Sequence, residues 1–176
     1  MKRVFLLAGT VLAASLVTAA VPYVDLRSVE RAIDRRLDNY SVADPIQVLG
    51  VSRGLYVEGT GAIFTSEVNL ALGPVLSPFH QEIAKEEVGK VRDRKKARLP
   101  ELRKLMQDTL VGSATGLPTM PPQEEIVYGV TMYYYTWEDA SGLPHQIVMR
   151  ATRQSLLDFE KGKLKSLEGA VRTQEF

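Results

Sequence analysis

The side chains that could carry acid–base chemistry are few, and no catalytic motif connects them. Two carboxylates can act together as acid and base when their surroundings separate their pKa values. The candidates are Glu67, Glu138 and Asp139, but no spacing pattern brings any two of them together. Neither histidine, His80 or His145, is tied by a motif to a nucleophile or an acidic partner. We therefore assign no catalytic residue and keep a carboxylate-dependent hydrolase as an alternative.

Several classes of site are excluded by composition. The chain has 176 residues, no cysteine and two histidines. Disulfides, thiolate metal sites, cysteine nucleophiles and a lipid-anchored cysteine are therefore excluded. No phosphate-binding loop, nucleophile elbow or zinc-protease motif is present. We expect no cofactor and no metal site, and the balance favours a protein that is not an enzyme.

Four side chains are the candidates for contact with a ligand or partner. Tyr133, Tyr135 and Trp137 alternate along one β-rich stretch, so they would share one face of a strand. Such a row can stack on sugars or bases, although it more commonly forms sheet core. Arg53 is the one charge on the apolar face of a predicted hairpin. It would either extend its head to water near the sheet edge or pair with a carboxylate or bound anion.

The most conspicuous charge feature is the basic run from Arg92 to Arg98, which contains five cations and one acidic residue, Asp93. Such a run can contact an anionic surface such as lipid headgroups or nucleic acid. The alternative is a solvated helix face balanced by Glu82, Glu86 and Glu87. We favour the solvated face.

The N-terminus has the three parts of a secretory leader. The basic residues Lys2 and Arg3 precede an apolar stretch, and small residues follow it, so cleavage is expected at Ala20. The alternative is an uncleaved membrane anchor, since Val4 to Val21 is 18 residues without a charge. Loss of the leader would leave 20 basic and 21 acidic residues. This near-neutral balance gives no electrostatic case for nucleic acid as a partner.

The best-specified structural element is a β-hairpin within residues 45–72. A two-residue loop at Gly59 and Thr60 would place Val57 opposite Ala62 and Arg53 opposite Ser66. This register separates an apolar face from a largely polar one, as expected for an antiparallel pair packed on a core. The apolar face would hold Val51, Leu55, Val57, Ala62, Phe64, Val68 and Leu70.

Helical and strand patterns alternate along the rest of the chain. Apolar spacing predicts a helix over 25–40, starting with Asp25 as N-cap. A helical region over 81–111 contains Pro100, so we expect two helices or one sharp kink there. A proline- and glycine-rich loop over 112–123 leads to a second hairpin. Its strands are expected at 124–138 and 145–151, and a last helix at 153–161.

These elements predict an α+β domain over residues 21–176 after a signal peptide at 1–20. Two hairpins, separated by the long proline-interrupted helical region and flanked by helices, would form a mostly antiparallel sheet of four or five strands. We expect an exported protein, periplasmic or extracellular, that binds an envelope protein or a small ligand without catalysis. The alternatives are a small-molecule sensor using the aromatic strand and Arg53, and the hydrolase. Membrane contact is expected only through a retained leader or the basic run Arg92 to Arg98.

Overall fold

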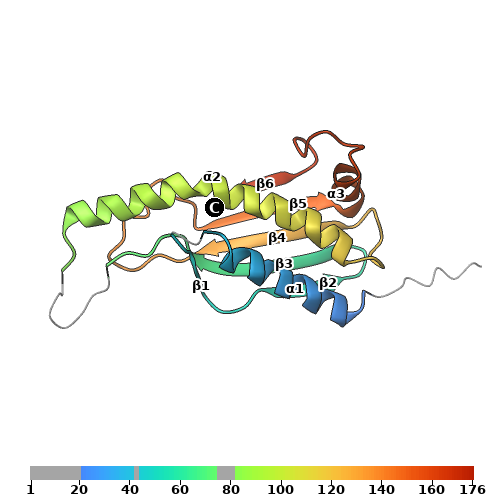
Figure 1. Cartoon of the computed structure of the whole chain (residues 1–176), viewed down its shortest axis with the longest axis horizontal. Helices are drawn as coiled ribbons and strands as arrows, with labels where there is room; N and C mark the ends of the chain where they lie inside the picture. Colours follow the sequence, from blue (N-terminus) through green and yellow to red (C-terminus); the bar gives the residue numbers. More distant parts are fainter. Residues whose placement is uncertain (1–20, 42–43, 75–81) are drawn as a thin grey trace, which may run out of the picture.

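The computed structural model describes residues 21–41, 44–74 and 82–176. Within them, three helices form one layer on a six-stranded sheet (Figure 1). The α+β fold class is therefore confirmed. The predicted leader at residues 1–20, its cleavage site at Ala20, and His80 lie outside the described residues and stay predictions. In the part of the chain that is described, no helix is long and apolar enough to cross a bilayer.

The sheet runs in the order β1-β3-β4-β5-β6, and β2 pairs with β3 beside β1. All pairs are antiparallel except β3 with β4, which are parallel because the long helix α2 carries the chain back across the sheet. The sheet is thus mostly antiparallel, as expected, but it has more strands than predicted. The strands are β1 (Gln47–Val48), β2 (Arg53–Val57), β3 (Gly61–Asn69), β4 (Glu125–Met132), β5 (Gln146–Thr152) and β6 (Arg172–Glu175).

The first hairpin exists, but its predicted register is wrong by one residue. Val57 lies opposite Gly61 and Arg53 opposite Thr65, so the loop holds three residues rather than two. A slip of one residue turns every side chain of a strand to the other face. Consequently Leu55 and Val57 of β2 are exposed, and Gly54 faces the helix layer instead. There is room for the ring of Phe64 because Gly54 has no side chain; a Cβ there would lie 2.5 Å from a ring carbon.

The first helix, α1 (Tyr23–Asp38), contacts β1, β2 and α2. It begins two residues before the predicted N-cap Asp25, with Pro22 at the cap position. Two acidic residues of α1 accept hydrogen bonds from the backbone of β2 and the residues just before it. Glu30 accepts from the Gly54 amide and Asp34 from the Ser52 amide, each at 2.8 Å. These bonds tie the edge of the sheet to the helix layer.

The second helix, α2 (Lys85–Gly116), runs without interruption through Pro100. Of the two predicted alternatives, two helices or one kinked helix, the structure has a single helix, and the axis of α2 changes direction near its middle (Figure 1). Proline removes one helical hydrogen bond, and Pro100 is exposed at the surface. Leu99 and Leu102, on either side of it, are both buried, so packing holds both halves against the rest of the molecule. The helix also continues into the predicted loop, which is shortened to Leu117–Glu124.

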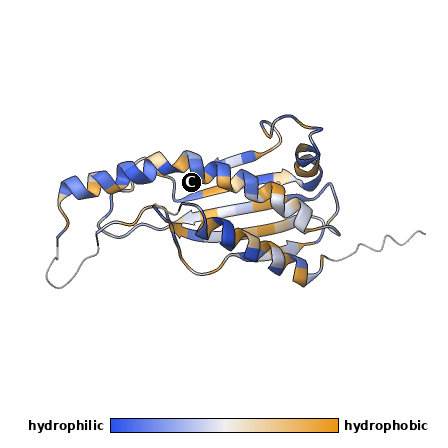
Figure 2. Ribbon diagram, in the orientation of Figure 1, coloured by the Kyte–Doolittle hydropathy of each residue, from blue (hydrophilic) through white to orange (hydrophobic). Residues whose placement is uncertain are grey.

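The core lies between the sheet and the helix layer, where apolar residues meet (Figure 2). The third helix, α3 (Arg153–Glu160), completes that layer through contacts with α2 and β5. Alternate residues of the three central strands face this core. They are Ala62, Phe64, Ser66 and Val68 of β3, Ile126, Tyr128, Val130 and Met132 of β4, and Ile147, Met149 and Ala151 of β5.

Tyr128 makes the stability of the protein depend on pH in the alkaline range. Its hydroxyl lies 3.1 Å from the Ser66 hydroxyl, and burial of the ring raises the pKa of Tyr128. An unfolded tyrosine ionises near pH 10. The stabilising contribution is therefore complete below that pH and is lost as pH rises toward the folded pKa.

Between pH ~10 and ~11.5, Tyr128 should make the free energy of unfolding of the wild type fall by up to about 1.4 kcal/mol per pH unit. We expect Tyr128→Phe to remove this contribution, so the free energy of unfolding of the variant should fall less steeply with pH. Urea unfolding of the wild type and the variant at several pH values measures this difference directly. Other titrating groups are shared by both proteins and cancel. Equal slopes would show that the Tyr128 hydroxyl is not buried.

Candidate functional site

Within residues 21–41, 44–74 and 82–176, no helix covers the sheet face opposite the helix layer, and we call it the open face. All three helices pack on the other side, which faces the viewer in Figure 1. Among the described residues no helix contacts this face. It consists of Val51 and the outward-facing residues of five strands, namely Arg53, Leu55 and Val57 of β2, Ile63, Thr65 and Glu67 of β3, Glu125, Val127, Gly129 and Thr131 of β4, Gln146, Val148 and Arg150 of β5, and Arg172 and Gln174 of β6.

An apolar strip crosses the open face. Strand register places Leu55 beside Ile63, and Ile63 beside Val127, in one row across three strands. Val57 lies two residues along the same strand from Leu55. Leu55 is 51% exposed and Val57 is 43% exposed, and Val51 at the same edge is 55% exposed. A contiguous apolar surface left in water is the usual mark of a contact site rather than of a free surface.

The next row of the open face has a glycine near its centre. It runs from Arg53 through Thr65 and Gly129 to Val148. Gly129 is itself buried, and a Cβ there would lie 3.8 Å from a methyl carbon of Val148 and 3.9 Å from a methyl carbon of Thr65. The side chains of the two neighbouring strands therefore cover the backbone at this position.

Arg53 lies at the rim of a hollow of about 310 Å³ on the open face. Thr65, Glu67 and Thr131 also line this hollow. Because the register differs from the prediction, Arg53 is exposed and does not enter the core. Of its two expected environments, the structure thus has the solvent-facing one near the sheet edge.

The predicted aromatic row does not lie along a strand, because β4 ends at Met132. The ring of Tyr133 contacts the ring of Tyr135 edge-on, with 5.1 Å between the ring centroids. Tyr135 stacks on Trp137, with 5.9 Å between the centroids. Trp137 in turn packs against Gly73, where a Cβ would lie 2.7 Å from the indole ring. The structure therefore brings these three aromatic residues together in a loop, whereas Arg53 lies apart on the open face.

The loop that follows β4 is fixed to α2 by a buried ion pair. The Lys95 ammonium contacts the Glu138 carboxylate, and both side chains are 2% exposed. Lys95 also donates to the Tyr133 carbonyl oxygen at 3.1 Å and lies over the Tyr134 ring. Burial lowers the pKa of Lys95, although Glu138 opposes this shift. The pair is enclosed, so it has a structural role rather than one at a surface.

Most cations of the basic run make contacts within the chain, and the predicted solvated face is wrong for Lys95 and Arg98, which are buried, while Arg94 and Lys96 are exposed as predicted. Arg92 pairs with Asp139 at 2.7 Å, and Arg94 donates to the Leu72 carbonyl oxygen at 2.6 Å. Arg98 is 7% exposed and pairs with Asp44 at 3.3 Å. These partners come from distant segments, which is why sequence neighbours alone did not reveal them.

The three candidate carboxylates do not meet. Glu67 lines the hollow on the open face, Glu138 is enclosed with Lys95, and Asp139 pairs with Arg92. Contacts with Ser141 and with Arg92 hold the pKa of Asp139 below its usual value. His145 lies against the Tyr134 ring, at 5.1 Å between centroids. Within residues 21–41, 44–74 and 82–176, no group of three or more metal-ligating side chains is positioned to hold an ion.

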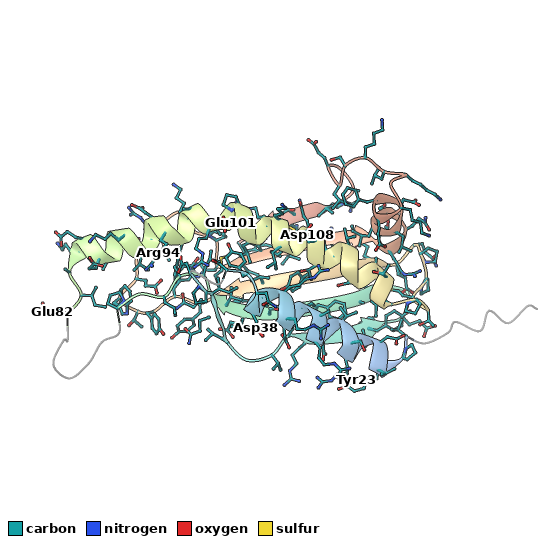
Figure 3. All side chains as sticks on the ribbon, viewed as in Figure 1. Tyr23, Asp38, Glu82, Arg94, Glu101 and Asp108 are labelled. Carbon is teal, nitrogen blue, oxygen red and sulfur yellow. The ribbon has the colours of Figure 1, made fainter. Side chains whose placement is uncertain are left out.

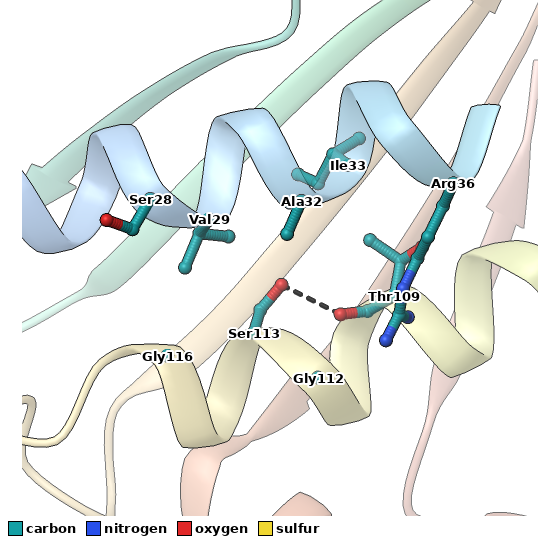
Figure 4. Close-up of a pocket in the computed structure, with 9 residues that line it drawn as sticks. All are labelled: Ser28, Val29, Ala32, Ile33, Arg36, Thr109, Gly112, Ser113 and Gly116. Carbon is teal, nitrogen blue, oxygen red and sulfur yellow. Dashed lines mark hydrogen bonds between the residues drawn. The ribbon is translucent and has the colours of Figure 1, made fainter. Parts of the chain in front are cut away.

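A second hollow, of about 110 Å³, lies at the seam between α1 and α2 (Figure 4). Two glycines of α2 allow the helices to approach. A Cβ at Gly116 would meet a methyl group of the buried Val29 at 2.7 Å, and one at Gly112 would meet the Arg36 guanidinium at 2.5 Å. Small residues at a helix crossing are sufficient to explain this hollow, so we treat it as packing.

The two glycines predict opposite responses to alanine. At Gly112 the obstacle is the far end of the exposed Arg36 side chain, which can move. Alanine is favoured over glycine within a helix by about 1 kcal/mol, so Gly112→Ala should stabilise by up to that amount. Gly116→Ala should destabilise, because Val29 cannot move without disturbing the core. Thermal unfolding of both variants measures this contrast, and equal shifts in melting temperature would contradict it.

No protein-family model, curated protein or solved structure matches this chain. The functional interpretation therefore depends on geometry. The open face is the feature that sequence reasoning missed, because the apolar residues of β2 were assigned to the core. The signal that could have revealed it is the three-residue alternative for the hairpin loop, which exposes Leu55 and Val57 together.

Proposed function

We propose that the protein is a non-enzymatic binding domain that docks a protein partner on its open face. The observation that supports this most directly is the apolar strip formed by Leu55, Val57, Ile63 and Val127, of which the two β2 residues are about half exposed. Burial of apolar area is the main favourable term in protein association. Exposure of this apolar strip to water is unfavourable, and binding of a partner would remove that unfavourable exposure.

The chemistry of the open face favours protein over other ligands. Its exposed aromatic residues are confined to one end, where Phe176 pairs with Gln146 and Tyr133 follows Thr131, so no row of stacking groups for bases or sugars crosses the face. Arg53, Arg150 and Arg172 share the face with Glu67 and Glu125, and Arg150 pairs with Glu125 at 3.6 Å. A polyanion would meet mixed charge there rather than a basic surface.

The dimensions of the open face also suit a protein partner. Five strands about 4.8 Å apart and four to nine residues long outline on the order of 500 Å². A stable protein interface buries about 800 Å² per partner, so this outline supplies more than half of the usual size. The hollow beside Arg53 is lined mainly by polar residues, whereas pockets for small ligands are lined mainly by apolar and aromatic ones.

We further propose that this binding takes place outside the cytoplasm, in the periplasm or the extracellular space. The support is the charged, apolar and small-residue order of residues 1–20, which is typical of a secretory leader. The absence of cysteine is compatible with an oxidising compartment.

Site-specific photo-cross-linking in the native host tests the docking proposal. A photoreactive phenylalanine derivative replaces Thr131 on the open face, and in a matched variant it replaces the exposed Lys96 on α2. We expect a discrete protein adduct from position 131 and none of the same mass from position 96. Failure to form an adduct from position 131, or the same adduct from both positions, would refute docking on this face.

A further inference from the structure

We propose that α1 docks the protein on an anionic lipid surface through a row of arginines on its outer side. The row consists of Arg27, Arg31 and Arg35, which are four residues apart and therefore follow one side of the helix. This inference goes beyond the proposed function, because it concerns the helix layer rather than the open face. The two contacts are compatible, since the helix layer and the open face lie on opposite sides of the sheet.

The arginine row faces solvent. Arg31 and Arg35 are exposed, and the side chain of Arg27 is 42% exposed. The helical repeat places Arg31 and Arg35 opposite the middle of the buried side of α1. That buried side holds Leu26, Val29, Ile33 and Leu37. The row is therefore on the part of the helix that is furthest from the core.

The acidic residues of α1 are mostly turned away from the arginine row. Four arginines and four acidic residues make the helix neutral as a whole. However, Glu30 and Asp34 accept hydrogen bonds from backbone amides in and just before β2, and Glu30 also pairs with Arg27. Asp25 is half-buried, and Asp38 is exposed at the last residue of the helix (Figure 3). The outer side thus carries three cations and one exposed carboxylate.

The start of α1 favours a lipid surface over other anionic partners. Tyr23 and Val24 in the first turn are 69% and 63% exposed, and Val24 lies two turns before Arg31 on the same side. Tyrosine is enriched at the boundary between water and lipid, and apolar residues beside cations are typical of helices that lie on a bilayer. The uncharged stretch Val4 to Val21 comes directly before this turn in the sequence. A nucleic acid would use the arginines without needing the apolar start.

The surface beside α1 does not oppose this contact. The hollow between the end of α1 and α2 is lined by Arg36 and Lys104 together with Glu101 and Asp108, so its charges balance. Each basic residue near an anionic membrane contributes about fivefold to binding. Three arginines therefore predict a weak and reversible contact, which salt should weaken further because it screens exposed charges.

A fluorescent reporter on α1 tests the lipid contact. The chain has no cysteine, so Ser28→Cys supplies a single thiol on the exposed side of α1, and Thr131→Cys supplies a matched one on the open face. Each protein is purified from its own host, labelled with a polarity-sensitive dye, and mixed with vesicles of phosphatidylcholine alone or with added phosphatidylglycerol. We expect the dye at position 28 to brighten only with the anionic vesicles, and the dye at position 131 to respond to neither.

The comparison of the two kinds of vesicle removes any effect of a retained leader. A leader that inserts into lipid would attach the chain to both kinds, so only the difference between them reports the contact of α1.

Two double variants of the position-28 protein identify the cations involved. Arg31→Gln with Arg35→Gln should raise the amount of anionic lipid needed for a half-maximal response about 30-fold, since two contributions of about fivefold are lost. Lys161→Gln with Lys165→Gln is the matched control. These two lysines are exposed in the loop after α3, which lies apart from α1 (Figure 1). Circular dichroism melts check that both variants are folded.

The outcomes separate this inference from the proposed function. A response to anionic vesicles that is weakened in the arginine variant and kept in the lysine variant supports lipid docking by α1. No response, an equal response to both kinds of vesicle, or an equal loss in the two variants overturns it. Docking of a protein on the open face is tested independently, by the adduct from position 131.

Discussion

Replacing Lys95 by alanine is expected to cost about 3–5 kcal/mol of folding free energy, because it leaves a buried carboxylate without its cation. Lys95 and Glu138 are both 2% exposed, so water cannot replace the lost partner. The substitution also removes the donor to the Tyr133 carbonyl oxygen. Small domains are stable by about 5–15 kcal/mol, so this single change should remove a large share of that margin.

The double variant Lys95→Met with Glu138→Leu is the matched control. Apolar residues of similar volume often replace a buried ion pair at little or no cost. We therefore expect the double variant to unfold in urea near the wild-type midpoint, whereas Lys95→Ala and Glu138→Ala unfold much earlier. A cost below about 1 kcal/mol for Lys95→Ala would be the value of an exposed pair, and it would contradict the enclosed position of Lys95.

Gly61→Ala is expected to be the second most damaging change. Gly61 has a φ of +132°, which is unfavourable for a residue with a side chain, and a Cβ would lie 1.8 Å from the Glu125 carbonyl oxygen. Glu125 is the first residue of β4, so the clash opens the parallel pair where it begins. The strain at φ costs about 1–3 kcal/mol, and the separation of the strands adds to it.

Gly59→Ala isolates the part of this loss of stability that comes from backbone conformation alone. Gly59 also has a positive φ, +78°, but nothing lies within 4 Å of a Cβ there. Its loss should therefore be confined to about 1–3 kcal/mol of conformational strain. Chemical unfolding of the two variants under one set of conditions gives the difference, which reports the β3–β4 contact. Equal losses would show that Gly61 is not pressed against Glu125.

The fold class and most elements could be predicted from periodicity alone. The strand at 146–152 and the helix at 153–160 are close to their predicted positions, and the strand at 125–132 begins where predicted but ends six residues earlier than the predicted 124–138. What periodicity could not reveal is register. A loop of two residues and one of three both fit Glu58-Gly59-Thr60-Gly61, and the choice between them decides whether Leu55 faces core or solvent.

The role of the basic run could not be predicted for a different reason. The carboxylates of Asp44, Glu138 and Asp139 approach α2 from loops that are distant in sequence. No local pattern encodes such a contact, whereas Glu87, one of the three acidic residues that suggested a solvated and balanced face, pairs with Lys90. The parallel pairing of β4 with β3 was likewise hidden, because the two strands are separated in sequence by the whole of α2.

The central claim, that the open face is covered when the protein works, is tested most directly by thiol accessibility. The chain has no cysteine, so Thr131→Cys and Lys96→Cys each supply a single thiol, one on the open face and one on the exposed side of α2. The rate of alkylation is compared between intact cells of the native host and dilute purified protein. We predict that Cys at position 131 reacts several-fold more slowly in cells, while position 96 reacts equally in both. Equal rates at position 131 would contradict the account.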